Sequence, residues 1–329
     1  MIRVAINGFG RIGRQVLQAG IHDSHIEWVA INDLTDTNTL AHLLKYDSVH
    51  GRSRYSVEAK PDGIVVNGKF IKVFAEKDPE KLPWKDLGID IVVESTGFFL
   101  TKEGAEKHLK AGAKKVLLSA DAKDDSIKTI IKGVNEHTYD KSTDHIVSNA
   151  SCTSNCSAPM VKVLSDNFGI ENAFFNTVHA VTSTQKLHDA PDANLRNARA
   201  AFVNIIPHKS GAAVAVPLTV PEVKGILDGM AIRIPVLDGS ITILTALLKK
   251  QTTVKEINQL FKNVSEHHLK GVLEYSEEKL VSTDIIHNPH SCILDSEFTK
   301  VSGKLVQILG WYDNEWGYSN RMVDVIKIL

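Results

Sequence analysis

The residue with the clearest chemistry in the chain is a cysteine near its middle. Cys152 lies in the run Ser-Cys-Thr-Ser-Asn-Cys at residues 151–156. Near the amino terminus, a strand-like stretch at 2–6 leads into a glycine-rich run at 7–13. Glycine-rich turns in this position bind the phosphates of dinucleotides, and a cysteine thiolate attacks carbonyl carbons. The two features together indicate oxidation of an aldehyde by a nicotinamide cofactor through a thioester.

The glycine-rich run has the surroundings that a dinucleotide-binding turn needs. Its three glycines follow a predicted strand and open a predicted helix; they are Gly8, Gly10 and Gly13. They allow a tight turn, and the amides of Arg11 and Ile12 would meet the pyrophosphate. Asp33, which ends the next predicted strand, can accept hydrogen bonds from a ribose diol and repels a 2′-phosphate. We therefore expect NAD; the structural alternative is an ordinary glycine turn with Asp33 as a helix cap.

We expect Cys152 at the amino terminus of a helix. It follows a strand-like stretch at 146–148 and precedes a predicted helix at 155–164. Partial positive charge at that end lowers the pKa of a thiol and favours the thiolate. Ser151 and Thr153 supply hydroxyls and amides that could bind an oxyanion or a phosphate.

Two nearby residues complicate this picture. Pro159 does not fit comfortably inside a helix, so either the helix kinks there or it begins after Cys152. Cys156 lies one helical turn beyond Cys152, and we expect it to be a small buried apolar residue. A zinc site would need a Cys-x-x-Cys partner, but Cys292 stands alone, so we expect no metal.

Acyl chemistry at a thiol needs a base, and histidine is the usual partner. The chain has 14 histidines, so spacing alone does not select one. His179 is the best candidate, because it ends the strand-like stretch 173–178 just before the polar segment 182–185. The alternative is an ordinary surface or core histidine.

The elements that must position these residues indicate an α/β fold with two domains. Up to residue 150, short β-branched runs alternate with amphipathic stretches, which is typical of a Rossmann-type parallel sheet. The expected strands are 2–6, 26–32, 89–94, 115–119 and 145–148, and the expected helices are 11–20, 38–46 and 103–111. Turn signals at 61–63 and 67–68 bound a small hairpin region.

The second half has longer alternating segments, which predict an α+β catalytic domain with a mostly antiparallel sheet. Its expected strands are 173–178, 229–235, 240–247, 292–295 and 305–312, and its expected helices are 160–167, 254–262 and 318–329. We expect residues 1–151 with 317–329 to form the NAD-binding domain and residues 152–316 to form the catalytic domain.

Composition excludes several other classes of protein. The 329 residues carry 38 lysines and arginines against 39 acidic residues, so no net field favours nucleic acid or an anionic membrane. No apolar run approaches the roughly 20 residues of a membrane helix, and the first strand leaves no room for a signal peptide. Three cysteines in so long a chain indicate a reducing compartment, and we expect the cytoplasm.

These motifs lie in strings that resemble the phosphorylating glyceraldehyde-3-phosphate dehydrogenase family of the bacterial type, nearly from end to end. The matching strings are 7–14 (NGFGRIGR), 43–51 (LLKYDSVHG), 94–97 (ESTG), 148–156 (SNASCTSNC), 204–207 (NIIP), 211–213 (GAA), 229–233 (GMAIR) and 311–319 (WYDNEWGYS). The resemblance implies oxidation and phosphorylation of D-glyceraldehyde 3-phosphate to 1,3-bisphosphoglycerate, with NAD, in glycolysis and gluconeogenesis. It also implies a homotetramer in which the segment near 181–203 packs between subunits.

The resemblance implies a role for individual residues. Cys152 is the nucleophile and His179 activates it. Contacts to the substrate or to inorganic phosphate are implied for Ser151, Thr153, Thr182, Ser210, Gly211 and Arg233. Contacts to NAD are implied for Arg11, Ile12, Asp33, Lys77, Ser119 and Asn314, the last near the nicotinamide amide.

The chain departs from the family pattern around the anion sites. Asn197 stands where many relatives carry an arginine that binds phosphate, and Lys209 stands in a loop that is usually a run of threonines. We hypothesise that Lys209 partly restores the lost charge, in which case Lys209→Thr would raise the Michaelis constant for phosphate or substrate. A solvent-facing lysine is the alternative.

Three other functions remain as alternatives. Erythrose-4-phosphate dehydrogenase shares the thiol, the histidine and the fold, although the string 211–213 follows the triose enzyme. An acetylating semialdehyde dehydrogenase is disfavoured by the string 149–156. A non-enzymatic NAD-binding redox sensor or interaction protein would not need His179 or Arg233, and both are present.

Overall fold

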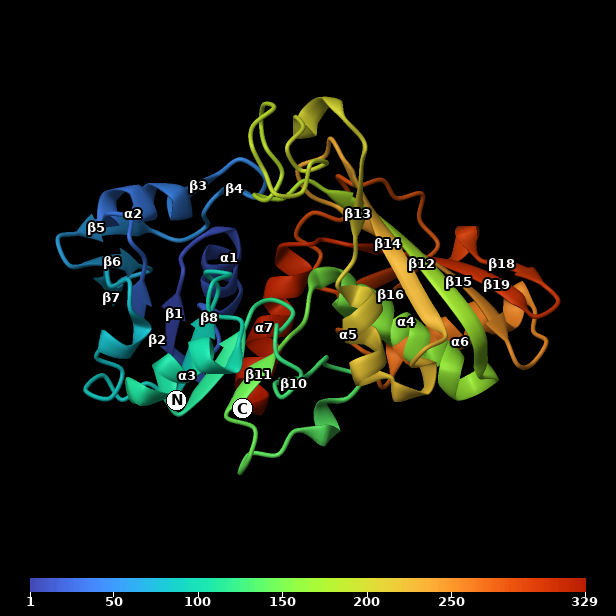
Figure 1. Ribbon diagram of the computed structural model, residues 1–329, viewed down its shortest axis with the longest axis horizontal. Coiled ribbons are helices and arrows are strands. Elements are labelled where there is room, and N and C mark those ends of the chain that lie inside the picture. Colours follow the sequence, from blue (N-terminus) through green and yellow to red (C-terminus); the bar gives the residue numbers. More distant parts are fainter. The chain divides into compact units, whose positions relative to one another are not determined.

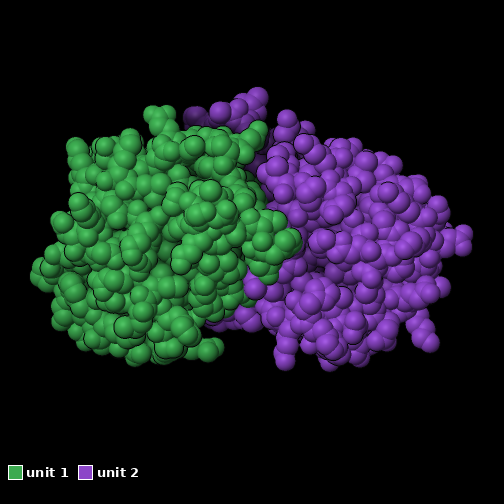
Figure 2. Space-filling view, turned by 90° about the horizontal axis from the view of Figure 1, so that it is seen from below, with its two compact units in different colours: residues 1–130, 136–150, 319–329 green, residues 131–135, 151–318 purple.

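The computed structural model describes all 329 residues, 1–329. They form two compact units, which Figure 2 colours separately. Unit 1 comprises residues 1–130, 136–150 and 319–329, and unit 2 comprises residues 131–135 and 151–318. None of the helices is both long enough and apolar enough to pass through a membrane.

Unit 1 is built on a nine-stranded sheet in the order β10-β11-β9-β8-β1-β2-β7-β6-β5. Its strands are β1 (Ile2–Asn7), β2 (Ile26–Asn32), β5 (Val57–Lys60), β6 (Gly63–Val66), β7 (Lys69–Phe74), β8 (Ile91–Glu94), β9 (Lys115–Leu118), β10 (Lys128–Thr129) and β11 (Ile146–Ser148). The strands from β10 to β7 are parallel, whereas β5, β6 and β7 form an antiparallel meander at the turn signals. The predicted Rossmann-type sheet is confirmed (Figure 1).

Helices cover both faces of this sheet. They are α1 (Arg11–Gly20), α2 (Thr37–Lys45), α3 (Lys102–Lys110) and most of α7 (Trp316–Ile328), and a short hairpin, β3 (Tyr46–Asp47) and β4 (Gly51–Arg52), follows α2. On one face Gly20 of α1 lies against Trp28 and against Val323 of α7, where a larger residue would clash. On the other face the buried Trp84 packs in an apolar cluster with Ala5 and Val92. Burial on both faces explains why the central strands are apolar throughout.

Unit 2 is built on an eight-stranded sheet in the order β13-β14-β12-β15-β19-β17-β16, with β18 paired to β19. Its strands are β12 (Ile170–Ala180), β13 (Ile206–Lys209), β14 (Leu227–Ile234), β15 (Ser240–Leu248), β16 (Leu273–Ser276), β17 (Cys292–Asp295), β18 (Lys300–Ser302) and β19 (Leu305–Tyr312). Only the β12–β14 and β16–β17 pairs are parallel. The predicted mostly antiparallel sheet is therefore confirmed.

Three helices pack with this sheet: α4 (Cys152–Phe168), α5 (Ala212–Thr219) and α6 (Val254–Glu266). Along β12 the side chains alternate, so that Phe175 and Thr177 are buried while Phe174 is 62% exposed. Helix α4 runs through Pro159 and already begins at Cys152. The alternative in which regular structure starts after Cys152 is wrong.

Candidate active site

A sharp turn from strand to helix presents Cys152. Ala150, fully buried, adopts a left-handed backbone conformation with φ 53°, which is unfavourable for a residue with a Cβ. Ser151 then caps α4, since its Oγ accepts a hydrogen bond from the amide of Ser154 at 3.2 Å. Cys152 is thus the first residue of the helix, and its sulfur lies at the positive end of the helix dipole.

His179 meets this thiol from the end of β12. Its Nε2 lies 3.3 Å from Cys152 Sγ, and its ring is almost fully buried. Its Nδ1 lies 2.7 Å from the carbonyl oxygen of Ala180. In the tautomer that carries its hydrogen on Nδ1, the ring donates this hydrogen to the Ala180 carbonyl, Arg233 Nη1 donates to the same oxygen, and the Nε2 lone pair faces the sulfur. The pair is arranged for transfer of the thiol proton to the imidazole.

Arg233 sets the charge of that imidazole. It lies opposite His179 in the β12–β14 ladder, and its Nη1 is 3.1 Å from the Ala180 oxygen and adjacent to His179 Nδ1. Burial and then the positive charge of Arg233 lower the pKa of His179 to about 3. The imidazole is therefore neutral at pH 7. A bound anion that offset the Arg233 charge would raise this pKa and favour transfer of the Cys152 proton.

A chain of hydroxyl groups lies behind the pair. Thr177 Oγ1 donates to the Ile241 carbonyl at 2.8 Å and lies 2.7 Å from the Tyr312 hydroxyl. Tyr312 must therefore donate to Thr177 and accept from Thr153 Oγ1, which is 3.0 Å away. Burial raises the pKa of Tyr312, so its hydroxyl stays neutral. The hydroxyl of Thr153 donates its hydrogen to Tyr312, so Thr153 can donate to an anion only through its backbone amide.

The other residues expected at the anion sites lie on loops of unit 2. The hydroxyl of Thr182 faces Gln185 Oε1 at 3.1 Å. Ser210 follows β13, and Gly211 is the amino-terminal cap of α5. The Nε of Arg233 is buried and has no hydrogen-bond partner.

The hypothesis that Lys209 supplies charge to this site is wrong. In the β13–β14 ladder Lys209 pairs with Met230, whereas His208 pairs with Ala231. Side chains alternate along a strand, so His208 shares a face with Arg233 and Lys209 lies on the opposite face. The exposure of Lys209 and Met230 agrees with this assignment.

Asn314 is held in a defined orientation within unit 2. The amide of Ala180 donates to Ser240 Oγ at 3.1 Å, and this hydroxyl donates to Asn314 Oδ1 at 2.7 Å. Because its oxygen accepts from Ser240, the Asn314 amide turns its NH₂ group the other way. The side chain can thus serve as a hydrogen-bond donor beside the strand that carries His179.

The glycine-rich turn borders a cavity of about 580 Å³ in unit 1. It is lined by Asn7, Gly8, Gly10, Asn32, Asp33, Leu34, Glu76, Lys77, Ser95, Thr96, Phe98 and Phe99. A Cβ on Gly13 would lie 2.2 Å from the Gly8 carbonyl, so only glycine fits there. Around Gly10 nothing lies within 4 Å, which leaves space in front of the α1 amides. A diphosphate fits this arrangement.

Asp33 lies at the edge of the same cavity. Its two oxygens accept from the amides of Phe9 at 2.8 Å and Thr35 at 3.0 Å. The guanidinium of Arg11 pairs with Asp47 at 2.7 Å, so Arg11 can contribute its amide to a bound phosphate while its charge is engaged elsewhere. The amide of Ser119 donates to the Glu94 carbonyl, which leaves its side chain for other contacts.

Sequence reasoning missed a buried polar network that fixes the strand ends beneath this cavity. Glu94 accepts from Asn7 Nδ2 at 2.6 Å and pairs with His108 Nε2 at 3.0 Å. Trp84 donates to His108 Nδ1 at 3.1 Å, so the hydrogen of the neutral ring is on Nε2 and points at Glu94. Asn32 completes the network through Asn7 Oδ1 at 2.7 Å.

Comparison with known proteins shows two consecutive family matches. Residues 2–102 match the NAD binding domain of glyceraldehyde 3-phosphate dehydrogenase, and residues 151–314 match its C-terminal domain. The chain belongs to the glyceraldehyde-3-phosphate dehydrogenase family. It is 54% identical over 327 residues to the glyceraldehyde-3-phosphate dehydrogenase of Streptomyces coelicolor. The aligned residues cover 98% of this chain and 97% of the relative.

Two further relatives give the same result. The chain is 54% identical over 325 residues to the glyceraldehyde-3-phosphate dehydrogenase of Geobacillus stearothermophilus, with 98% of this chain and 97% of the relative covered. It is 51% identical over 325 residues to glyceraldehyde-3-phosphate dehydrogenase 1 of Bacillus subtilis, with the same shares covered. The resemblance inferred from the sequence strings is confirmed, and so is NAD as the cofactor of this family's amino-terminal domain.

The position of Asp33 in this family's NAD domain gives a testable consequence. We expect Asp33→Asn to lower the preference for NAD over NADP by about tenfold or more, because one charge-assisted contact is worth about 1.5–3 kcal/mol. Steady-state kinetics with each cofactor would measure the ratio of the two kcat/KM values. An unchanged ratio would show that Asp33 does not select the cofactor.

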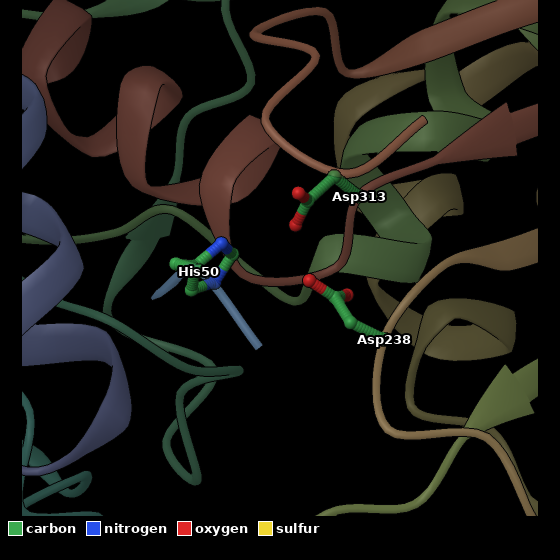
Figure 3. Close-up of side chains that lie close together, drawn as sticks. All are labelled: His50, Asp238 and Asp313. Atoms are coloured by element: carbon green, nitrogen blue, oxygen red, sulfur yellow. The ribbon is translucent and has the colours of Figure 1, made fainter. Parts of the chain in front are cut away.

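A second consequence concerns the paired carboxyls of Asp238 and Asp313, which Figure 3 shows side by side. Asp313 accepts hydrogen bonds from the amides of His287, Glu315 and Trp316, at 2.7, 2.9 and 2.6 Å. These three donors favour a carboxylate on Asp313. Burial, followed by the charge of Asp313, raises the pKa of Asp238 to about 9, so Asp238 holds a proton at neutral pH.

The raised pKa of Asp238 makes stability fall as pH rises. From about pH 4 to pH 9 the unfolded chain releases this proton while the folded chain keeps it. We expect Asp238→Asn, which cannot ionise, to gain on the parent in free energy of unfolding between pH 5 and pH 8, by up to about 1.4 kcal/mol for each pH unit. Urea unfolding at pH 5 and pH 8 measures both proteins; an equal pH dependence in the two would contradict the assignment.

Proposed function

We infer that this protein oxidises D-glyceraldehyde 3-phosphate with NAD and passes the acyl group to inorganic phosphate, which yields 1,3-bisphosphoglycerate. Family membership supports the reaction class. The single structural observation that carries the chemistry is the 3.3 Å approach of Cys152 Sγ to the His179 Nε2 lone pair at the start of α4.

The first step is attack by sulfur on the aldehyde carbon. Cys152 forms the C–S bond while its proton passes to Nε2 of His179, and the carbonyl becomes an oxyanion. The first-turn amides of α4 and the protonated His179 stabilise this oxyanion. Arg233 binds the substrate phosphate, and its charge is offset by that dianion at the moment when His179 takes up a proton.

The second half of the reaction oxidises the bound carbon to a thioester and then releases Cys152. Protonated His179 first gives its proton to the oxyanion, which becomes a hydroxyl group. His179 then removes that hydroxyl proton as the carbon is oxidised, and a thioester on Cys152 results. NAD, when bound, supplies the two-electron acceptor for this step. Inorganic phosphate then attacks the thioester carbon, the C–S bond breaks, and Cys152 returns as the thiolate.

The site residues divide between the two halves of the chain. We assign the NAD-binding domain to residues 1–151 with 317–329 and the catalytic domain to residues 152–316. The proposed NAD ligands are Gly8, Gly10, Arg11, Ile12, Gly13, Asp33, Lys77, Ser119 and Asn314. The proposed ligands of substrate or inorganic phosphate are Ser151, Thr153, Thr182, Ser210, Gly211 and Arg233.

We also propose a homotetramer in the cytoplasm. Unit 2 exposes large apolar side chains on the segment after β12, including Leu187 (68%), Leu195 (81%) and Val203 (79%), and on its sheet, including Phe174 (62%). Apolar area of this extent is usual at subunit contacts. Light scattering of the purified protein tests the assembly state.

A phosphate-dependent assay of NADH formation tests the function. We expect activity with glyceraldehyde 3-phosphate that requires phosphate, and a lower kcat/KM with erythrose 4-phosphate. Preference for the four-carbon sugar would support the alternative dehydrogenase. NAD binding without turnover of either aldehyde would instead support a sensor or interaction protein.

A further inference from the structure

A histidine and an amide next to Arg233 form a pair whose hydrogen bonds are incomplete. Asn197 is only 8% exposed, and its Nδ2 lies 3.4 Å from Nε2 of His208. The other side of the ring is fixed, since His208 Nδ1 lies 2.6 Å from the Lys209 carbonyl oxygen and must donate to it. Asn197 Oδ1 is buried and has no hydrogen-bond partner.

This arrangement belongs to the neutral form of His208. With its hydrogen on Nδ1, the ring can only accept at Nε2, so Asn197 has to turn its NH₂ group toward the ring. A buried acceptor left without a partner costs about 1–3 kcal/mol. A protonated ring would donate from Nε2, the amide of Asn197 would turn over, and Oδ1 would gain its partner. The same turn would free the NH₂ group to donate elsewhere.

The pair lies beside the site at which a phosphate is expected. His208 and Ala231 are paired across β13 and β14, and Arg233 is two residues further on the same face. His208 is also close enough for its charge to lower the pKa of His179. Arg233 of β14 and His179 of β12 are the titratable or charged groups whose proximity to His208 follows from the ladder register and from this electrostatic effect. Lys209 lies on the opposite face.

We propose that His208 and Asn197 form a proton-dependent phosphate-binding pair that works beside Arg233. This proposal rests on the proposed function and names the residues that recognise the phosphate of its substrate. Two cations held close together, such as Arg233 and a protonated His208, repel each other when no anion is present. A phosphate dianion offsets both charges, so phosphate binding and proton uptake by His208 favour each other.

The pair therefore makes phosphate affinity depend on pH. Histidines exchange their ring proton between about pH 5 and 8, and a charge-assisted contact worth about 1.4 kcal/mol is a tenfold change in affinity. When His208 is protonated, His208 and Asn197 both donate to the phosphate. When His208 is neutral, only Arg233 and neutral donors remain.

His208→Asn is the informative variant, because its amide can still donate to the Lys209 carbonyl while the titrating nitrogen is lost. We expect its KM for glyceraldehyde 3-phosphate to exceed that of the parent by about tenfold at pH 6, falling to about twofold at pH 8.5. The ratio of the two KM values at each pH cancels titration of the substrate phosphate itself. Lys209→Thr is the matched control from the opposite face, and its KM should follow the parent at every pH.

Protection of Cys152 from iodoacetamide by inorganic phosphate measures the same site without turnover. We expect His208→Asn to need about tenfold more phosphate for half-protection at pH 6. A KM ratio and a protection constant that stay at one across the pH range would overturn the proposal. Failure of the parent to make NADH, together with phosphate protection that still depends on His208, would overturn the proposed function and leave the phosphate pair standing.

Discussion

Cys152→Ser is expected to abolish phosphate-dependent NADH formation, with a loss of at least about 10³-fold in kcat, the scale seen when a catalytic nucleophile is removed. The serine hydroxyl would lie in the same place at the start of α4, next to the His179 Nε2 lone pair. It is far less acidic than a thiol, so the neutral imidazole cannot draw off its proton to any useful extent. NAD binding, measured by fluorescence quenching, should be retained because the glycine-rich turn is untouched.

Cys156→Ser is the matched control for that experiment. Cys156 lies one turn further along the same helix, is fully buried, and has Sγ 3.7 Å from the Gly310 carbonyl oxygen. A serine there can donate to the same oxygen, so we expect kcat within a few-fold of the parent and some loss of stability. Equal loss of activity in both variants would show that the helix, and not one sulfur, is required.

His179→Asn is expected to lower kcat by about 10²- to 10⁴-fold, the usual contribution of a positioned acid–base group. Asparagine keeps a polar side chain near the Ala180 carbonyl, but it cannot accept the proton of Cys152 or return it to the oxyanion. The rate of Cys152 alkylation by iodoacetamide at pH 7 should fall as well. That second measurement separates loss of thiol activation from loss of the later hydride step.

Tyr312→Phe controls for disturbance of the buried surroundings of His179. The ring of Tyr312 meets the imidazole edge to face at 5.9 Å between centroids, and phenylalanine would keep that contact. Only the hydrogen bonds to Thr153 and Thr177 are lost. A fall in kcat as large as that of His179→Asn would contradict the assignment of proton transfer to His179.

Local patterns in the sequence predicted most of the fold. Strand 26–32 and helix 11–20 agree with β2 and α1 residue for residue, because apolar periodicity and glycine boundaries coincide there. Helix α4 was harder to predict, since its first turns bury polar side chains such as Ser154 and Asn155 and carry no apolar stripe. Its start depends on the Ser151 cap and the Ala150 turn, which are tertiary features.

For the candidate site, the sequence identified the side chains but not how they are arranged relative to one another. It brought Cys152 and His179 together because a thiol needs a base, and the structure places them in contact. Burial and the charge of Arg233 lower the pKa of this histidine, and no local pattern in the sequence indicates that effect. Sequence reasoning also assigned Lys209 to the anion site, because the face that a strand residue occupies depends on ladder register, which the sequence alone does not give.

The most direct test of the whole account omits inorganic phosphate. Parent protein mixed with NAD and glyceraldehyde 3-phosphate should give a rapid burst of one NADH per subunit and then stop. Mass spectrometry of the stopped enzyme should find the acyl group on Cys152, and added phosphate should restart turnover. Continuous NADH formation without phosphate, or a burst that leaves Cys152 unmodified, would contradict the thioester mechanism.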